Sequence, residues 1–282
     1  GGEPRDGRVE VVAPDTIRGK AVHQVNPLVA LGVGDSAPGT TGISTIYFHA
    51  RASRPFASHG TWSDGVVTAG SPSAAGTRVG AFGTFATAAG DVVELRVGIS
   101  FISEDEARAA LDAECADRTF EEVRAAAVAD WNRLLSRIEV EGGTDAEKTV
   151  FYTALYHALM QPADYTEGGR FWIGADGFGK VVEAGAHRWY TDDWCTWDTF
   201  RTTHPLLAFL EPEVKDDMVQ ALVRTYEHSG WMQKCPWNAT GDSRVMSGNS
   251  EYCVVADAVA KGFDGFATSA AARSRTTWRR GG

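Results

Sequence analysis

Features that mark several large classes of protein are missing from this sequence of 282 residues. No apolar run approaches the ~18 residues that a membrane-spanning helix needs, so we expect no membrane span. The net charge is −10 at pH 7, which argues against nucleic acid as a partner because most of the surface would repel a polyanion. The sequence has no initial methionine and no basic-then-apolar leader. We therefore expect either that a signal was removed or that the chain starts within a longer gene.

Cysteine is scarce, with four residues and no CxxC pair among them. A structural zinc site usually takes closely spaced cysteines, so we do not expect one. Four cysteines could form two disulfides, but free buried thiols are the interpretation we favour, because unpaired cysteine behaves as a small buried hydrophobe. The four residues are Cys115, Cys195, Cys235 and Cys253.

Apolar residues are plentiful, at 43% of the chain, and they follow two patterns in succession. In the first hundred residues, short apolar or alternating runs are separated by Gly, Ser and Pro, which is typical of antiparallel strands. The predicted strands cover residues 9–13, 44–50, 77–87 and 91–102. The last strand should bury one face in a sandwich sheet, and the residues of that face are Val93, Leu95, Val97, Ile99 and Phe101.

A helical pattern follows from about residue 103. Three capping boxes predict where helices begin: Ser103 with Glu106, Thr119 with Glu122, and Thr144 with Glu147. The third helix stops at Pro162 and is apolar on several sides, so we expect it to be buried on more than one side. Residues 163–195 should form hairpins and loops.

Further helices are predicted after residue 197. One covers about residues 198–210. The next has Pro212 in its first turn and Gly230 just past its end. Another should begin with Ser250 as N-cap and stop at Gly262.

The last sixteen residues, 267–282, do not continue this pattern. They contain four arginines, no acid and no Val, Ile or Leu. A disordered basic tail would have such a composition, and so would the product of a reading-frame error or a truncation after about Phe266. We favour the second interpretation, because the helical run stops there.

The residues that could carry chemistry gather between positions 189 and 251. Five of the nine tryptophans lie in loops before and after two predicted helices, beside aspartates, arginines and an amide. A sugar ring has an apolar C–H face that stacks on indole, and its hydroxyls bond to carboxylates, amides and guanidinium groups. This mixture predicts a carbohydrate site. Its members are Trp189, Trp194, Trp197, Trp231, Trp237, Asp192, Asp193, Asp198, Arg201, Asp242, Arg244, Asn249 and Glu251.

Each of these residues also has a purely structural interpretation. Tryptophans in helical hairpins are most often core residues. Asp198 could be the N-cap of the helix predicted to begin there, and Arg201 could simply pair with it. His204, which precedes Pro205, is expected to be structural. The functional interpretation depends on all these features sharing one region.

Three segments of this region resemble glycoside hydrolase family 92: WDTFRTTHPLL at 197–207, EHSGWMQKCPW at 227–237 and VMSGNSEYCVVADAVAKGF at 245–263. The resemblance includes residues 138–162 and reaches weakly back through 97–114 and 79–87, so it spans most of residues 9–266. Family members are exo-acting α-mannosidases of bacteria and fungi that depend on Ca²⁺ and invert the anomeric centre. They are built from a β-sandwich and an (α/α)6 barrel.

The resemblance therefore implies the end of an antiparallel β-sandwich followed by the incomplete start of an (α/α)6 barrel. We expect the partial sandwich at residues 1–102, linking helices at 103–143, the first part of the catalytic barrel at 144–266, and the aberrant or disordered tail at 267–282. An incomplete barrel would leave apolar helix faces uncovered, and the face we expect to be uncovered consists of Val219, Leu222, Val223 and Tyr226.

For the site, the resemblance implies that Trp197 and Asp198 contact the hydroxyls of mannose in the −1 subsite. Arg244, Asn249 and Glu251 carry over as pocket residues. In the family, the acid, the base and most Ca²⁺ ligands come from later parts of the barrel, so we assign no catalytic residue and no metal ligand here. We expect this chain alone to be inactive, its partner to be a mannose-containing glycan, and the full-length protein to be secreted or periplasmic.

One segment departs from the family pattern. Many members read Met-x-Gly-Asp/Thr-His where this chain reads Met246-Ser247-Gly248-Asn249-Ser250, without the histidine. A donor-rich segment of this kind could bind phosphate as well as a sugar, so a mannose-phosphate diester is an alternative substrate. A non-catalytic carbohydrate-binding protein, and a structural helical array with a Trp-rich core, are further alternatives.

Overall fold

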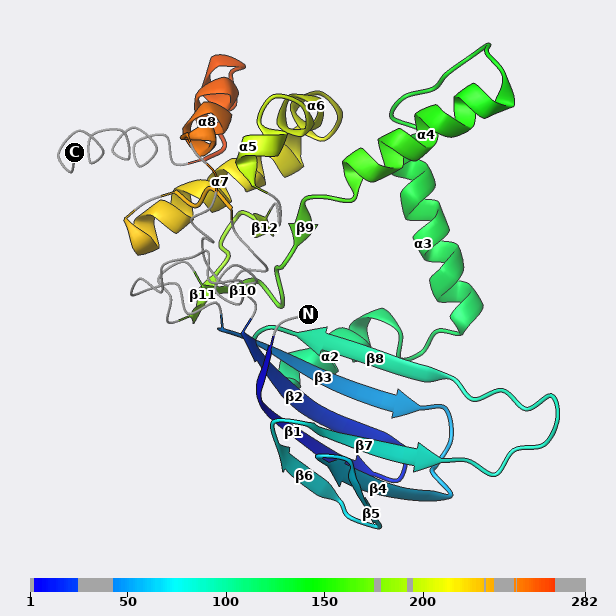
Figure 1. The fold of residues 1–282 in the computed structure, drawn as a ribbon. Helices are drawn as coiled ribbons and strands as arrows, with labels where there is room; N and C mark the ends of the chain where they lie inside the picture. Colours follow the sequence, from blue (N-terminus) through cyan, green and yellow to red (C-terminus); the bar gives the residue numbers. More distant parts are fainter. Residues whose placement is uncertain are drawn as a thin grey trace. The chain divides into compact units, whose positions relative to one another are not determined.

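A computed structural model of the chain describes residues 3–24, 43–174, 179–191, 195–230, 232–235, 246 and 248–266. These residues divide into two compact units, with the boundary between residues 126 and 127. Figure 1 shows that the first unit is built mainly of strands and the second mainly of helices. This order confirms the predicted antiparallel domain followed by a helical run.

The first unit contains two antiparallel sheets, one with the order β6-β1-β2-β3-β8 and the other with the order β5-β4-β7. The predicted strands correspond to β1, β3, β7 and β8, whereas the other four were not predicted. β5 and β6, with the sequences VVTA and SAAG, are too short and weakly patterned to be recognised without their neighbours. The bounds are β1 (Glu3–Ala13), β2 (Thr16–Gln24), β3 (Ile43–Ala52), β4 (Ser58–Ser63), β5 (Val66–Ala69), β6 (Ser73–Gly76), β7 (Val79–Thr84) and β8 (Leu95–Ser100).

The face of β8 that we expected to be buried is the more exposed one. Leu95, Val97 and Ile99 keep 63%, 48% and 60% of their surface exposed, whereas Gly98 and Ser100 on the opposite face are buried. The reason is α2 (Glu104–Glu114), which packs so closely on that opposite face that a Cβ at Gly98 would collide with the backbone carbonyl of Ala107. Alternation shows which residues share a face, but the covering element decides which face is buried.

Three helices begin where their capping residues predicted. In α2, the Ser103 hydroxyl accepts from the backbone N–H of Glu106 at 3.1 Å. α3 (Phe120–Leu135) and α4 (Asp145–Leu159) follow Thr119 and Thr144. In α4, the capping box is complete: the Thr144 hydroxyl accepts from the backbone of Glu147, and the Glu147 carboxylate accepts from the backbone N–H of Thr144 at 2.7 Å. These starts therefore depend on local hydrogen bonds.

The prediction that α4 is buried on more than one side is wrong for the described residues. Within α4, which is described in full, Leu155 is the one buried residue, and Val150 is 71% exposed. An apolar surface on several sides shows that a helix needs neighbours, but the described residues cover α4 on one side only, where Trp131 of α3 packs against Tyr156 with ring centroids 4.4 Å apart. Other apolar side chains, such as Val150 in α4 and Met160 at its C-cap, are therefore exposed among the described residues.

The second unit continues with short strands and four helices. β9 (Ala163–Asp164) pairs with β12 (Tyr190–Thr191), and β10 (Arg170–Ile173) pairs with β11 (Lys180–Glu183). The helix predicted for about residues 198–210 is divided into α5 (Thr196–Thr199) and α6 (Thr203–Leu210). α7 (Pro212–Ser229) begins and ends as predicted, with Gly230 in the left-handed region at φ 85°. α8 covers Ser250–Ala260.

The apolar face of α7 is covered, contrary to our expectation. Val219 and Val223 are fully buried and Leu222 is 8% exposed, while Tyr226 packs against the same cluster from its edge. α8 covers this face with Val254, Val255 and Ala258, and Met232 and Phe266 complete the cluster. The prediction failed because it assumed that this face of α7 needs helices from later in the barrel. In the structure, the apolar faces of α7 and α8 bury each other. The tail at 267–282 lies outside the described residues.

Candidate functional site

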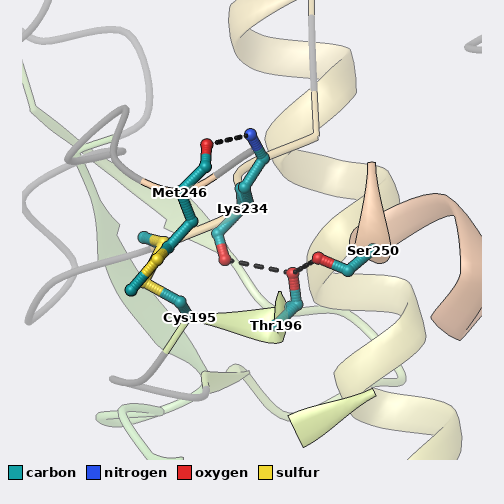
Figure 2. Close-up of a disulfide and its surroundings, with 6 residues drawn as sticks. Cys195, Thr196, Lys234, Met246 and Ser250 are labelled. Carbon is teal, nitrogen blue, oxygen red and sulfur yellow. Dashed lines mark hydrogen bonds between the residues drawn. A yellow bond between two sulfur atoms is a disulfide. The ribbon is translucent and has the colours of Figure 1, made fainter. Parts of the chain in front are cut away.

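A disulfide joins the start of α5 to the segment after α7. Cys195 and Cys235 are bonded across a sequence separation of 40 residues, so the prediction of free thiols is wrong for this pair, while Cys115 and Cys253 are free. The pairing depends on the fold, because α6 and α7 return the chain and bring the two positions together. The spacing alone could not show this. Figure 2 shows the bond and its surroundings.

Thr196, next to this disulfide, connects three segments of the chain. Its backbone N–H and its hydroxyl both donate to the carbonyl of Lys234, at 2.8 and 3.1 Å. The same hydroxyl lies 3.0 Å from the hydroxyl of Ser250, the first residue of α8. Lys234 in turn donates through Nζ to the carbonyl of Met246 at 2.9 Å. Figure 2 shows these bonds joining the start of α5, the segment at 234–235 and the start of α8.

Ser250 therefore does not serve as the N-cap that we predicted. The N-cap position of α8 is Asn249, whose side chain makes no capping bond. Asn249 is exposed, and its carbonyl accepts from the backbone of Tyr252 at 3.2 Å. The hydroxyl that a cap would use is directed instead toward Thr196, so α8 is joined to α5 at its first residue.

Trp197 and Asp198 follow Thr196 on α5, and both side chains are exposed, Trp197 by 40%. Asp198 is not an N-cap, because the cap position is Cys195 and Asp198 lies within the first turn. Its backbone N–H donates to the carbonyl of Cys195 at 2.9 Å. An exposed indole ring beside an exposed carboxylate is a combination that can stack on a sugar ring and accept from its hydroxyls.

Arg201 lies over aromatic rings on the same stretch. Its guanidinium carbon is 4.5 Å from the ring centroid of Phe200 and 5.9 Å from that of Trp197. Among the described residues, no ion pair joins Arg201 to Asp198, so the alternative interpretation of Arg201 as a structural partner of Asp198 is wrong. The guanidinium group instead makes cation–π contacts with these rings, and such a contact contributes about 0.5–1 kcal/mol at exposed positions.

His204 is structural, as expected from the sequence. It is 1% exposed, and its Nδ1 lies 3.3 Å from Nζ of Lys215, which is fully buried on α7. Burial, and then the charge of Lys215, lower the pKa of His204 to about 3, whereas burial lowers that of Lys215 to about 8. At neutral pH the ammonium therefore donates to a neutral imidazole.

The remaining predicted site residues are placed differently from one another. Glu251 sits in the first turn of α8 but is 4% exposed, which leaves little of it open to a ligand. Trp189 is a core residue, 4% exposed and stacked on Phe171 with centroids 4.0 Å apart. Several predicted residues lie outside the described part of the chain: Arg244, Asp192, Asp193, Trp194, Trp231, Trp237 and Asp242.

A small cavity beside Thr196 has too little room for a sugar. Its volume is about 30 Å³, and its lining includes Trp189, Thr196, His204 and Gln233. That space suits one or two water molecules, whereas pockets for small organic ligands start at about 300 Å³. This cavity is therefore not a sugar site, whereas the surface of Trp197 and Asp198 is exposed.

The structure thus brings α5 and the start of α8 together and adds residues that the sequence did not indicate. Thr196 and the cystine beside it were overlooked because each looks unremarkable in its local sequence. The one available signal was position: Cys195 and Thr196 directly precede the WDTFR string, and Cys235 lies within the second matching segment.

The chain matches the two domains of one enzyme family. The glycosyl hydrolase family 92 N-terminal domain matches residues 2–100, and the family 92 catalytic domain matches residues 106–278. A protein from Arthroderma benhamiae described as an uncharacterized secreted glycosidase is 27% identical over 173 residues, which are 60% of this chain and 18% of that protein.

Solved structures of the family have the same fold. The family 92 inverting mannosidase of Bacteroides thetaiotaomicron is 27% identical, with a TM-score of 0.82 over 95% of this chain and 35% of that one. An α-mannosidase of the same bacterium, solved with mannoimidazole, gives a TM-score of 0.84 at 24% identity over 97% of this chain and 35% of that one. The sequence thus spans about a third of the length of these solved relatives. Its two units correspond to their N-terminal β-sandwich and the start of their helical barrel domain, and the chain belongs to glycoside hydrolase family 92.

Proposed function

We propose that the complete protein is an exo-acting α-mannosidase that hydrolyses terminal α-mannosides of glycans with inversion. The observation that carries the proposal is the exposed Trp197–Asp198 pair, held at the junction of α5 and α8 in a chain that matches both domains of the family. The solved relatives described as mannosidases support the choice of sugar.

The proposed roles of the chain's own residues are binding and orientation. The indole of Trp197 stacks on the apolar face of the terminal mannose, and the carboxylate of Asp198 accepts hydrogen bonds from its hydroxyls. Asn249 and Arg244 are proposed as further polar contacts. Glu251 is proposed as a pocket residue that reaches the ligand only if the packing around it opens.

The reaction also needs groups that we place in other parts of the protein. Inversion requires an acid that protonates the leaving oxygen and a base that activates water, with the two carboxyl groups about 6.5–9.5 Å apart. We assign neither role to a described residue. The 282-residue chain would accordingly contribute binding surface but no chemical step.

We also propose that the complete protein requires Ca²⁺. Among the described residues, no group of three His, Cys, Asp or Glu side chains could hold a metal ion. These residues alone therefore do not fit a calcium site, and we derive no step through the ion. The proposal is tested by chelating the full-length enzyme with EDTA and adding back Ca²⁺ or Mg²⁺: activity that survives chelation would contradict it.

The compartment proposed for the full-length protein is secreted or periplasmic. The Cys195–Cys235 disulfide supports this, because such bonds persist mainly in oxidising compartments. In the described part of the chain, no helix is long and apolar enough to cross a membrane. Peptide mapping of the natural protein, isolated without reductant, should find the peptides that contain Cys195 and Cys235 joined to each other. Separate, unjoined peptides would show that the bond is absent.

The activity is tested on the full-length enzyme with an aryl α-mannoside, and with the matching α-glucoside as control. Hydrolysis of the mannoside alone is expected, and NMR should detect β-mannose as the first product because the anomeric centre inverts. A mannose-phosphate diester in parallel tests the alternative substrate. Binding of mannose to a protein that turns over none of these compounds would indicate a carbohydrate-binding protein instead.

A further inference from the structure

The short helix α5 cannot fix its own orientation. It has four residues, Thr196–Thr199, and its N-cap Cys195 offers no side-chain capping bond. A single turn is unstable in isolation, because the first turn costs more chain entropy than its hydrogen bonds return. The directions of Trp197 and Asp198 must therefore be set by contacts that α5 makes with other segments.

The hydroxyl of Thr196 supplies these contacts from a buried position, with 2% of the residue exposed. A hydroxyl has one proton to donate, and here it goes to the carbonyl of Lys234 at 3.1 Å. The 3.0 Å bond to Ser250 must then run the other way, with the Ser250 hydroxyl as the donor. One oxygen thus joins α5 to two segments at once, in the arrangement of Figure 2.

The disulfide makes the same connection covalently, one residue away on each side. Cys195 precedes Thr196, and Cys235 follows Lys234, the residue whose carbonyl accepts both Thr196 bonds. The disulfide therefore keeps Thr196 close to the carbonyl of Lys234. The hydrogen bond between Thr196 and Ser250 links the same point to the start of α8, where Ser250 lies between Asn249 and Glu251. We call Thr196, Ser250 and the Cys195–Cys235 disulfide together the α5 clamp.

We propose that Thr196 is a positioning residue, and that the α5 clamp sets the orientation of Trp197 and Asp198 relative to the start of α8. Thr196 itself contacts no sugar, because it is buried beneath the two residues that would. This inference rests on the proposed function. It adds that correct binding depends on a hydroxyl and a disulfide that lie behind the binding surface.

The decisive comparison is between Thr196→Val and Thr196→Ser in the full-length enzyme. Valine keeps the volume and loses the hydroxyl, whereas serine keeps the hydroxyl and loses a methyl group. We expect kcat/KM of Thr196→Val to fall about tenfold or more, mainly through KM, because small displacements of binding groups cost that much. Thr196→Ser should stay within about threefold of the wild type, although its Tm falls through lost packing.

A merely structural role predicts a different ranking. If Thr196 only filled space, kcat/KM measured well below both melting temperatures would be unchanged in Thr196→Val, and that result would overturn the proposal. Equal losses in the valine and serine variants would also overturn it, because the hydroxyl would then not be the determinant.

The disulfide is tested separately by Cys195→Ser combined with Cys235→Ser, with Cys115→Ser as the matched control. Cys115 is a free cysteine in the first unit, so its loss should leave kcat/KM unchanged. The double variant should raise KM about fivefold or more, again because the binding groups are displaced. A double variant with wild-type KM would show that the cystine does not position the site.

A readout without turnover separates this inference from the proposed activity. The protein is labelled with 5-fluorotryptophan, and the Trp197 resonance is assigned from its loss in Trp197→Phe. Thr196→Val should shift or broaden that ¹⁹F resonance, and Thr196→Ser should not. A wild-type enzyme that hydrolyses no mannoside would defeat the proposed function alone, whereas an unchanged Trp197 resonance in Thr196→Val would defeat the positioning role alone.

Discussion

Asp198 offers the sharpest test of the site, because the structure separates its effect on stability from its effect on activity. Its side chain is exposed and is not an N-cap, so Asp198→Asn removes only a favourable interaction with the start of a one-turn helix. That interaction is worth at most about 0.3–1 kcal/mol. We therefore expect Tm to fall by no more than about 4 °C, on the scale of about 2–4 °C per kcal/mol for a large domain.

The expected loss of activity is larger. A hydrogen bond from a sugar hydroxyl to a carboxylate contributes about 1.5–3 kcal/mol, and each 1.4 kcal/mol is a factor of ten. Loss of one such bond in Asp198→Asn should lower kcat/KM of the full-length enzyme by about 10- to 150-fold, and Asp198→Ala should lower it at least as much. The assay is hydrolysis of an aryl α-mannoside beside a thermal melt of the same preparation.

A matched control exists on a later helix. Glu213 is also an exposed acid in the first turn of a helix, α7, so Glu213→Gln removes the same helix-end interaction without touching the proposed sugar surface. Its kcat/KM should stay within twofold of the wild type. Near-normal activity of Asp198→Asn, or an equal loss in Glu213→Gln, would refute the assignment of Asp198 as a sugar contact. Asp192→Ala, at a position outside the described residues, should also cost much less than Asp198→Ala.

Further predictions concern the chain and its buried pair. The isolated 282-residue chain should release no mannose from an α-mannoside, with or without Ca²⁺, because we assign no acid or base to it; any measurable release would contradict this. Lys215→Met should raise Tm at pH 7 by about 2–4 °C or more, because it removes a buried charge whose desolvation is only partly offset; a lower Tm would contradict this. The pKa of Lys215 is lowered to about 8 in the folded state, so wild-type stability should rise between about pH 8 and its ordinary pKa near 10.5, and this rise should vanish in Lys215→Met. The pKa of His204 is lowered to about 3, so urea unfolding should show stability falling as the pH drops from about 6.5 toward 3, since the unfolded state then binds the proton more readily. Phe209, 80% exposed on α6, should promote association of the isolated chain, so Phe209→Ser should lower aggregation in light scattering, whereas Val219→Ser should increase it by disrupting a buried cluster.

The sequence predicted those features that local chemistry determines. The starts of α2, α3 and α4 followed from capping residues within three positions of each other, and the end of α7 followed from Gly230. The WDTFRTTHPLL string, together with the segments at 227–237 and 245–263, was sufficient to indicate the family. In each case, the determining residues lie next to one another in the chain, so no knowledge of the fold was needed.

The features that failed depend on what packs against what. The exposed face of β8 could not be told from its buried face until α2 was placed on one of them. Ser250 has the right type and position for an N-cap, but its hydroxyl bonds to Thr196, 54 positions earlier. Similarly, the pairing of Cys195 with Cys235 required the return of the chain through α6 and α7. These residues matter to the proposed site because they act across long sequence distances.

The helix starts also have a consequence for the order in which the protein can assemble during synthesis. α2, α3 and α4 each begin with hydrogen bonds between residues three positions apart, so each start can form as soon as its own turn leaves the ribosome. α5 and α8 have no side-chain cap and depend on each other through Thr196 and Ser250. The segment that presents Trp197 must therefore wait in an unformed state until more than fifty further residues have been translated. Any factor that slows translation within that interval would prolong the exposure of this aromatic segment to proteases and chaperones.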